Sequence, residues 1–176
     1  MLTDISNVNN NFDLISISVA VFIVDFIVIC IAKNTNLFGN VINTWYEKLG
    51  MTAVLIDVFI IIIGLIITRY VFYYFNLEFT PSMFIIIAVI IQLVHDILLY
   101  KLFIESSNEG DNTIIDLYKN YSIENGAKIL LADSGMVIAS ALIAMYLKNF
   151  ELHYTFGIFF LVIYLIPYVV YQNKLK

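Results

Sequence analysis

Four aspartates lie inside long apolar segments of the sequence, where acidic side chains are unexpected. They are Asp25, Asp57, Asp96 and Asp133. A lone charge at the centre of a bilayer costs at least about 2.5–3.5 kcal/mol, so an ionisable residue in such a segment is expected to serve a function. Carboxylates in this setting could bind a cation or relay protons. The alternative is a hydrogen-bonded polar layer that fixes the register of the helices.

The four aspartates are predicted to lie at nearly one depth. Seven or eight residues separate each of them from the end of its helix that we predict to be cytoplasmic. At about 1.5 Å per residue, all four lie about 10–12 Å below that boundary. Each aspartate also shares a helical face with small or polar residues, as Asp57 does with Gly64 and Asp133 with Ser140. Because small residues let helices approach closely in lipid, we expect the aspartates to point at one another.

Four ionised carboxylates in one dry layer require neutralisation. Some carboxyl groups could be protonated, because desolvation and like-charge repulsion both favour the neutral form. Lys101 and Lys128 are the possible counter-charges, since each lies five residues from an aspartate toward the cytoplasm. Gln92 and His95 add polar groups beside Asp96, and water or a bound metal ion are further candidates.

His95 directly precedes Asp96 and could act as a proton relay or as half of a metal site. The other histidine, His153, is predicted to lie at the opposite interface. A histidine-rich zinc site is therefore not expected. We interpret His95 as an interior polar group with satisfied hydrogen bonds, and we predict neither a metal nor a cofactor.

The segments that carry the aspartates are long enough to cross a membrane. The chain is 61% hydrophobic and 13% charged, whereas a soluble domain carries about 25% charged residues. A spanning helix needs about 20 apolar residues. We therefore predict an all-α membrane protein with one domain, residues 1–176, formed by a bundle of about five transmembrane helices. The predicted spans are residues 14–32, 49–73, 81–104, 126–147 and 152–171.

The longest connection between spans is predicted to hold one short interfacial helix. This helix would cover about residues 111–124, with Asp111 as its cap. Ile114 and Leu117 then fall on one face, which favours a position along the membrane surface. The connection at residues 33–48 is expected to be a loop with interfacial aromatic residues.

The distribution of basic residues predicts the orientation of the chain in the membrane. Seven lysines fall on one predicted side, whereas Lys148 and Arg69 fall on the other, so we expect the N-terminus outside the cytoplasm and the C-terminus inside. The seven are Lys33, Lys48, Lys101, Lys119, Lys128, Lys174 and Lys176. Arg69 is expected to snorkel to the interface or to pair with Glu78.

Composition and motifs exclude several classes of function. The net charge is −5 with only 9 Lys and Arg residues, so nucleic-acid binding is not expected. The single cysteine, Cys30, rules out an intramolecular disulfide. No glycine-rich phosphate loop is present, and an enzyme is not favoured. A lipid-modifying enzyme with His95 and Asp96 as its acid–base pair is left as the weakest alternative.

Short stretches spread over most of the chain carry a family resemblance. They are Trp45-Tyr46-Glu47-Lys48-Leu49-Gly50, Gln92-Leu93-Val94-His95-Asp96, Ala132-Asp133-Ser134 and Tyr164-Leu165-Ile166-Pro167-Tyr168. In these stretches the chain resembles uncharacterised multi-pass membrane proteins of large nucleocytoplasmic DNA viruses. The resemblance implies a protein of a viral internal membrane, in the virion or in host-derived endoplasmic reticulum membrane. It transfers no catalytic residue.

Two functions of different classes follow from the sequence. The first is a structural membrane protein that assembles as a homo-oligomer or with other membrane or capsid-associated proteins. Short loops and the lack of a catalytic motif favour it, with residues 105–125 and 172–176 as docking surfaces. The second is a small cation or proton channel or transporter that uses the four aspartates, again as an oligomer within the lipid bilayer.

Overall fold

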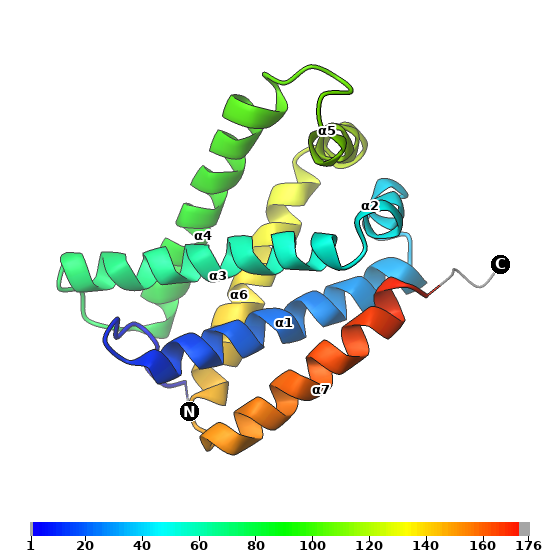
Figure 1. The fold of residues 1–176 in the computed structure, drawn as a ribbon. Helices are drawn as coiled ribbons and strands as arrows, with labels where there is room; N and C mark the ends of the chain where they lie inside the picture. Colours follow the sequence, from blue (N-terminus) through cyan, green and yellow to red (C-terminus); the bar gives the residue numbers. More distant parts are fainter. Residues whose placement is uncertain (1, 173–176) are drawn as a thin grey trace.

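A computed structural model describes residues 2–172, and this part of the chain is helical and contains no β-strand. Figure 1 shows its α-helices, and a π-helical turn, η1, continues α4. The elements are α1 (Asn11–Asn34), α2 (Val41–Leu49), α3 (Met51–Tyr74), α4 (Pro81–Leu99), η1 (Tyr100–Ile104), α5 (Thr113–Asn125), α6 (Lys128–Leu147) and α7 (Leu152–Val170).

Five helical segments are long and apolar enough to cross a membrane. They are α1, α3, α4 together with η1, α6 and α7, and they have 19 to 24 residues each. Large apolar side chains such as Phe59, Ile63 and Ile86 are exposed on them, which suits contact with lipid chains. The predicted fold class, an all-α bundle of five membrane-spanning helices, is confirmed.

α1 is the helix around which the others are arranged. It packs against α3, α6 and α7, while α4 packs against α3 and α6. α1, α3, α4 and α6 therefore surround a common interior, and α7 lies outside them against α1 (Figure 1). The four surrounding helices are those that contain the aspartates, whereas α7 contains none.

The connection after α1 contains a helix that the sequence analysis did not predict. α2 continues to Leu49, where the next span was expected to begin, and the chain then turns at Gly50. Gly50 has φ +53°, and a Cβ atom at this position would lie 2.6 Å from the hydroxyl oxygen of Tyr171. Only glycine adopts this left-handed conformation without a steric cost. α3 therefore begins at Met51 rather than at residue 49.

α5 is the short helix predicted in the longest connection, but Asp111 does not cap it. The cap is Asn112, whose Oδ1 accepts hydrogen bonds from the backbone N–H groups of Ile114 at 2.8 Å and Ile115 at 3.3 Å. An asparagine in this position satisfies amide groups that the first helical turn leaves without partners. The helix consequently begins at Thr113.

α2 and α5 pack together at one end of the four surrounding helices (Figure 1). The rings of Trp45 on α2 and Tyr118 on α5 have centroids 4.8 Å apart. At the start of α2, the carboxylate of Glu124 accepts hydrogen bonds from the backbone N–H groups of Asn40 and Val41, both at 2.8 Å. These bonds favour the charged form and lower the pKa of the Glu124 carboxyl. We refer to these helices as the α2–α5 pair.

The α2–α5 pair lies at the end of the bundle that the sequence analysis assigns to the cytoplasm. Lys174 and Lys176, which contribute to that assignment, lie outside the described residues, as does most of the tail at 172–176. The orientation of the chain therefore stays a prediction.

Candidate functional site

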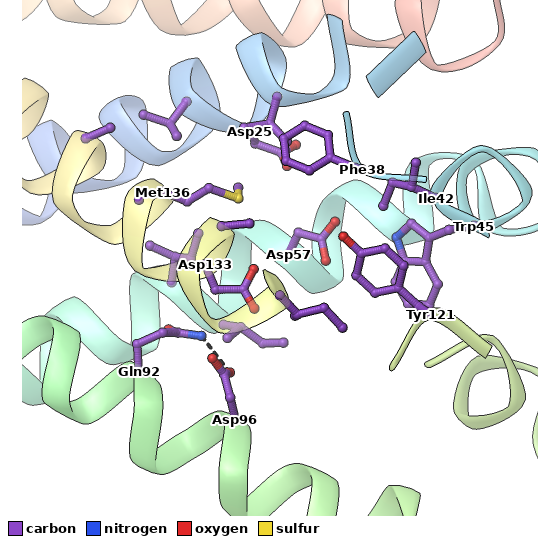
Figure 2. A pocket seen from close by; sticks show the side chains of 18 of the residues that line it. Asp25, Phe38, Ile42, Trp45, Asp57, Gln92, Asp96, Tyr121, Asp133 and Met136 are labelled. Atoms are coloured by element: carbon purple, nitrogen blue, oxygen red, sulfur yellow. Dashed lines mark hydrogen bonds between the residues drawn. The ribbon is translucent and has the colours of Figure 1, made fainter. Parts of the chain in front are cut away.

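A cavity of about 330 Å³ lies among the four surrounding helices, next to the α2–α5 pair (Figure 2). Side chains of α1, α3, α4 and α6 form its walls, and side chains of the α2–α5 pair line one end. Much of the wall is apolar, with Val28, Ile61 and Met136 as examples. Cavities of about 300–1,000 Å³ with apolar walls and a few polar groups are typical of small-molecule sites.

All four aspartates selected from the sequence line this cavity, one from each wall helix. Asp57 lies within electrostatic range of Asp25, and Asp133 lies within range of Asp57 and Asp96. Figure 2 shows the same order across the cavity, from Asp25 through Asp57 and Asp133 to Asp96. We refer to this arrangement as the aspartate row. The structure thus brings together carboxyl groups that are far apart in the chain.

Asp25 is fully buried and lacks polar partners. None of its surface is exposed, and neither carboxyl oxygen has a hydrogen-bond partner. A buried polar group without a compensating hydrogen bond is costly, and a charged one is more so. The structure thus leaves the Asp25 carboxyl group without the donor that a hydrogen-bonded polar layer would supply.

Asp96 is held by two neighbours on its own helix. Gln92 Nε2 donates a hydrogen bond to Asp96 Oδ1 at 2.8 Å, and His95 Nδ1 lies 3.0 Å from the same oxygen. The other oxygen, Oδ2, is buried without a partner. Gln92 lines the cavity but His95 does not, and 40% of the His95 side chain is exposed. His95 therefore orients Asp96 from outside the cavity.

Asp57 faces the aromatic end of the cavity. The indole N–H of Trp45 is the side-chain donor that acts on Asp57 from this end. Tyr46, Tyr118 and Tyr121 also line the cavity. Burial, reinforced by nearby carboxylates, raises the pKa of all three phenols, so their hydroxyl groups stay neutral. This end of the cavity therefore offers rings and hydrogen-bond donors without a positive charge.

The two lysines suggested as counter-charges do not face the aspartate row. Lys101 forms an ion pair with Glu105 at 2.8 Å, and 60% of its side chain is exposed. The two residues are one helical turn apart, a spacing that favours such pairs. Lys128 is exposed at the start of α6, and neither lysine lines the cavity. The structure therefore places neither Lys101 nor Lys128 beside the carboxyl groups of the aspartate row.

The aspartate row thus consists of carboxyl groups that are spread over four helices. Among residues 2–172, no lysine, arginine or histidine side chain lines the cavity. Within residues 2–172, no three His, Cys, Asp or Glu side chains are grouped closely enough to hold a metal ion. The carboxyl groups surround a space rather than converge on a point.

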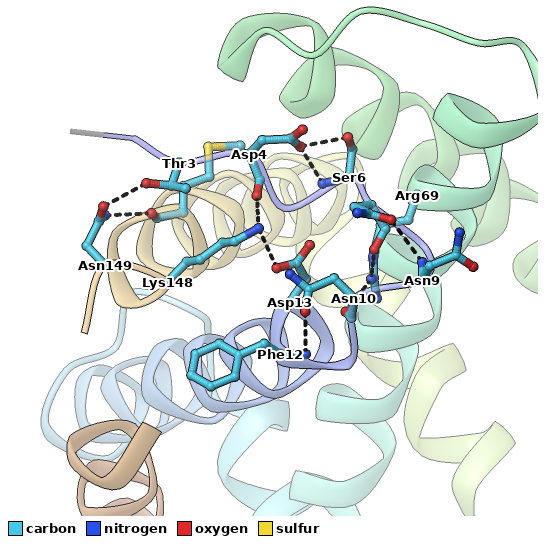
Figure 3. A network of polar contacts seen from close by, with 12 residues as sticks. Thr3, Asp4, Ser6, Asn9, Asn10, Phe12, Asp13, Arg69, Lys148 and Asn149 are labelled. Carbon is cyan, nitrogen blue, oxygen red and sulfur yellow. Dashed lines mark hydrogen bonds and ion pairs between the residues drawn. The ribbon is translucent and has the colours of Figure 1, made fainter. Parts of the chain in front are cut away.

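A second group of buried charges lies around the start of α1 (Figure 3). Asp13 is fully buried and forms an ion pair with Lys148 at 2.6 Å. Lys148 also donates a hydrogen bond to the backbone carbonyl of Asp4. The hydroxyl of Thr3 donates to Asn149 Oδ1 at 2.7 Å, which ties the N-terminal segment to the α6–α7 turn.

Arg69 belongs to the same group and neither snorkels nor pairs with Glu78. It is 4% exposed and donates hydrogen bonds to the backbone carbonyls of Asn7 and Asn10. The N-terminal segment folds over the end of α3 and supplies these acceptors. We refer to Asp13, Lys148, Arg69 and their partners as the N-terminal network.

Sequence reasoning missed the contribution of α2 to the cavity. Ile42, Trp45, Tyr46 and Leu49 recur with the spacing of one face of an amphipathic helix. Trp45 and Tyr46 are buried, and both line the cavity. This pattern could have identified α2. A search for membrane spans passes over it because 9 residues are too few to cross a bilayer.

Comparison of the chain with protein-family models, curated proteins and solved structures found no match. The resemblance to membrane proteins of large DNA viruses therefore stays a prediction.

Proposed function

We propose that the protein is a small cation or proton channel or transporter that takes its cation into the aspartate row. The observation that carries this proposal is that four carboxyl groups from four helices line one cavity to which no basic side chain of the described residues contributes. Like charges repel one another more strongly in a buried site than in water, because the effective dielectric constant there is lower. Such a row favours the entry of protons or other cations.

The surroundings of the row suggest how a cation would reach it. The α2–α5 pair lines one end of the cavity. Toward the N-terminal network, the helices are closed by buried side chains that include Ile17, Leu65 and Ala141. A cation would therefore enter from the α2–α5 end, and its passage to the other side would require the helices to move apart. This arrangement favours a gated pathway over a permanently open pore.

Flux measurements in liposomes test the proposal. We expect purified protein to carry cations or protons down an imposed gradient, read with a pH-sensitive or cation-sensitive dye. Asp57→Asn and Asp133→Asn should reduce the flux to that of empty liposomes, because each removes a charge from the row. Asp111→Asn is the matched control, since Asp111 lies in an exposed loop away from the cavity. Absence of flux with folded, oriented wild-type protein would contradict the proposal.

A structural role in membrane assembly is the second candidate, and exposed apolar residues near the α2–α5 end favour it. Ile123 of α5 is 82% exposed and Leu131 of α6 is 76% exposed. A second copy of the chain or a capsid-associated protein could cover these side chains, in line with the viral resemblance. If assembly is the function, Ile123→Asp should reduce cross-linking between copies in membranes. Replacing all four aspartates with asparagine should then impair assembly or stability. Neither the wild-type protein nor this fourfold variant should carry cations across liposome membranes.

A lipid-modifying enzyme receives the least support from the site. Its proposed acid–base pair, His95 and Asp96, is hydrogen-bonded, but His95 does not line the cavity. Unchanged lipid turnover in a His95→Ala variant would remove this alternative.

A further inference from the structure

The size of the cavity limits the kind of cation that it suits. Ca²⁺ takes about six to eight oxygen ligands that converge on it, and Mg²⁺ requires a near-octahedral set. No three acidic, histidine or cysteine side chains of the described chain are grouped in this way. A cavity of about 330 Å³ is also larger than one dehydrated ion needs. It falls instead within the range of about 300–1,000 Å³ that holds small organic ligands.

Unpartnered oxygens at both ends of the aspartate row show where donors are missing. At one end, both oxygens of the fully buried Asp25 lack a partner. At the other end, Asp96 Oδ2 is buried and also lacks one. An ammonium group carries a positive charge and three N–H donors, so it meets both needs of such a carboxylate. Two ammonium groups are required to serve the two ends.

The space between the ends suits a hydrocarbon chain. Figure 2 places Asp25 and Asp96 on opposite sides of the cavity, with Asp57 and Asp133 between them. Apolar side chains, among them Ile61 and Met136, form the walls along this line. Rings at the α2–α5 end, such as Trp45, could add cation–π attraction for an ammonium group.

We infer that the ligand is a linear aliphatic amine with two or more ammonium groups, one bound at Asp25 and another at Asp96. Its methylene chain would lie against Ile61 and Met136. This inference rests on the proposed function and specifies the class of cation that the same cavity takes.

Calorimetric titration of the purified protein in lipid nanodiscs tests the inference with defined probes. We expect 1,4-diaminobutane to bind at least about tenfold more tightly than 1-aminobutane. Asp25→Asn and Asp96→Asn should each reduce the affinity for the diamine to that for the monoamine, because each removes one anchor. Asp111→Asn should leave both affinities unchanged. The comparison of the two amines on wild-type protein decides the question even if a variant fails to fold.

The outcomes separate this inference from the proposed function. Equal affinity for the two amines would overturn the inference, because the second ammonium group of the diamine would then gain nothing from the aspartate at the other end of the row. Binding of K⁺ or Mg²⁺ alone, lost in Asp57→Asn, would overturn it as well but leave the proposed cation function standing. No binding of any cation, together with no flux, would overturn both.

Discussion

The N-terminal network and the aspartate row place buried acids of the same helix, α1, in opposite circumstances. Asp13 meets a lysine at 2.6 Å. Asp25, three turns further along α1, meets no donor at all. Both side chains are fully buried, so burial alone does not mark a functional site. The difference is that Asp25 lines a cavity whereas Asp13 is closed in by its partner.

The buried acids have partners in one region and lack them in the other. In the N-terminal network, the charges tie the N-terminal segment to α3 and α6 through Arg69 and Lys148. In the aspartate row, carboxyl groups from four helices line a cavity to which no basic side chain of the described residues contributes. The first arrangement pairs its buried charges, whereas the second leaves oxygens of Asp25 and Asp96 without hydrogen-bond partners.

The largest effect is expected from breaking the ion pair of the N-terminal network. Lys148→Met leaves the fully buried Asp13 without its partner, and such a loss costs about 3–5 kcal/mol in unfolding free energy. Unfolding in mixed micelles with increasing SDS measures it. The double variant Asp13→Asn with Lys148→Met should recover most of the loss. A cost below about 1 kcal/mol would place this pair with ordinary surface ion pairs and weaken the comparison.

The same substitution at the two aspartates of α1 should act with opposite sign. Asp25→Leu removes a buried group without partners and should raise the unfolding free energy by about 1–3 kcal/mol. Asp13→Leu should lower it, because Lys148 loses its partner. Both variants can be compared in the SDS titration used for Lys148→Met. If Asp25→Leu is destabilising, Asp25 has a structural role and the contrast between the two regions fails.

A smaller effect is expected where the row meets the α2–α5 pair. Trp45→Phe keeps an aromatic ring but removes the indole N–H that acts on Asp57, and a hydrogen bond between them would make the loss about 1 kcal/mol. A double-mutant cycle with Asp57→Asn measures the part that belongs to this contact. Additive effects of the two substitutions would show that the hydrogen bond contributes nothing measurable.

The smallest effect concerns Glu124, an acid whose partners are backbone amides at the surface. Its pKa in the folded protein is lowered from 4.5 by the N–H groups of Asn40 and Val41. The contact therefore stabilises the fold at pH values above about 4.5 and is lost as the pH falls through the lowered value. Hydrogen exchange should show reduced protection of the Asn40 and Val41 amides in acid. In Glu124→Gln, protection of these two amides should no longer depend on pH.

The features that the sequence predicted correctly are those fixed by the bilayer itself. Apolar segments of about 20 residues identify spans because the hydrocarbon core sets their length. Each of the four aspartates could be selected because an acid stands out within such a segment. The cavity that they line could not be predicted, because its shape depends on how α1, α3, α4 and α6 pack.

Partners of the charged residues were harder to predict, for reasons that differ between cases. The pairing of Asp13 with Lys148 depends on helix packing across almost the whole chain. Arg69 finds backbone carbonyls, which carry no signature in the side-chain sequence. The ion pair of Lys101 with Glu105 could have been predicted, because the i, i+4 spacing of the two residues is visible in the sequence.

The contact between Gly50 and Tyr171 has a consequence for the order in which the protein is made. Tyr171 follows α7, and its hydroxyl occupies the space that a side chain at Gly50 would need. Ribosomes release the chain from its N-terminus onward, so all four aspartate helices and the α2–α5 pair emerge before this tyrosine. The turn at Gly50, between α2 and α3, therefore meets the Tyr171 side chain only after α7 has been synthesised. Until then, the nascent protein can hold its four aspartate helices in the membrane while the position of the α2–α5 pair is not yet fixed.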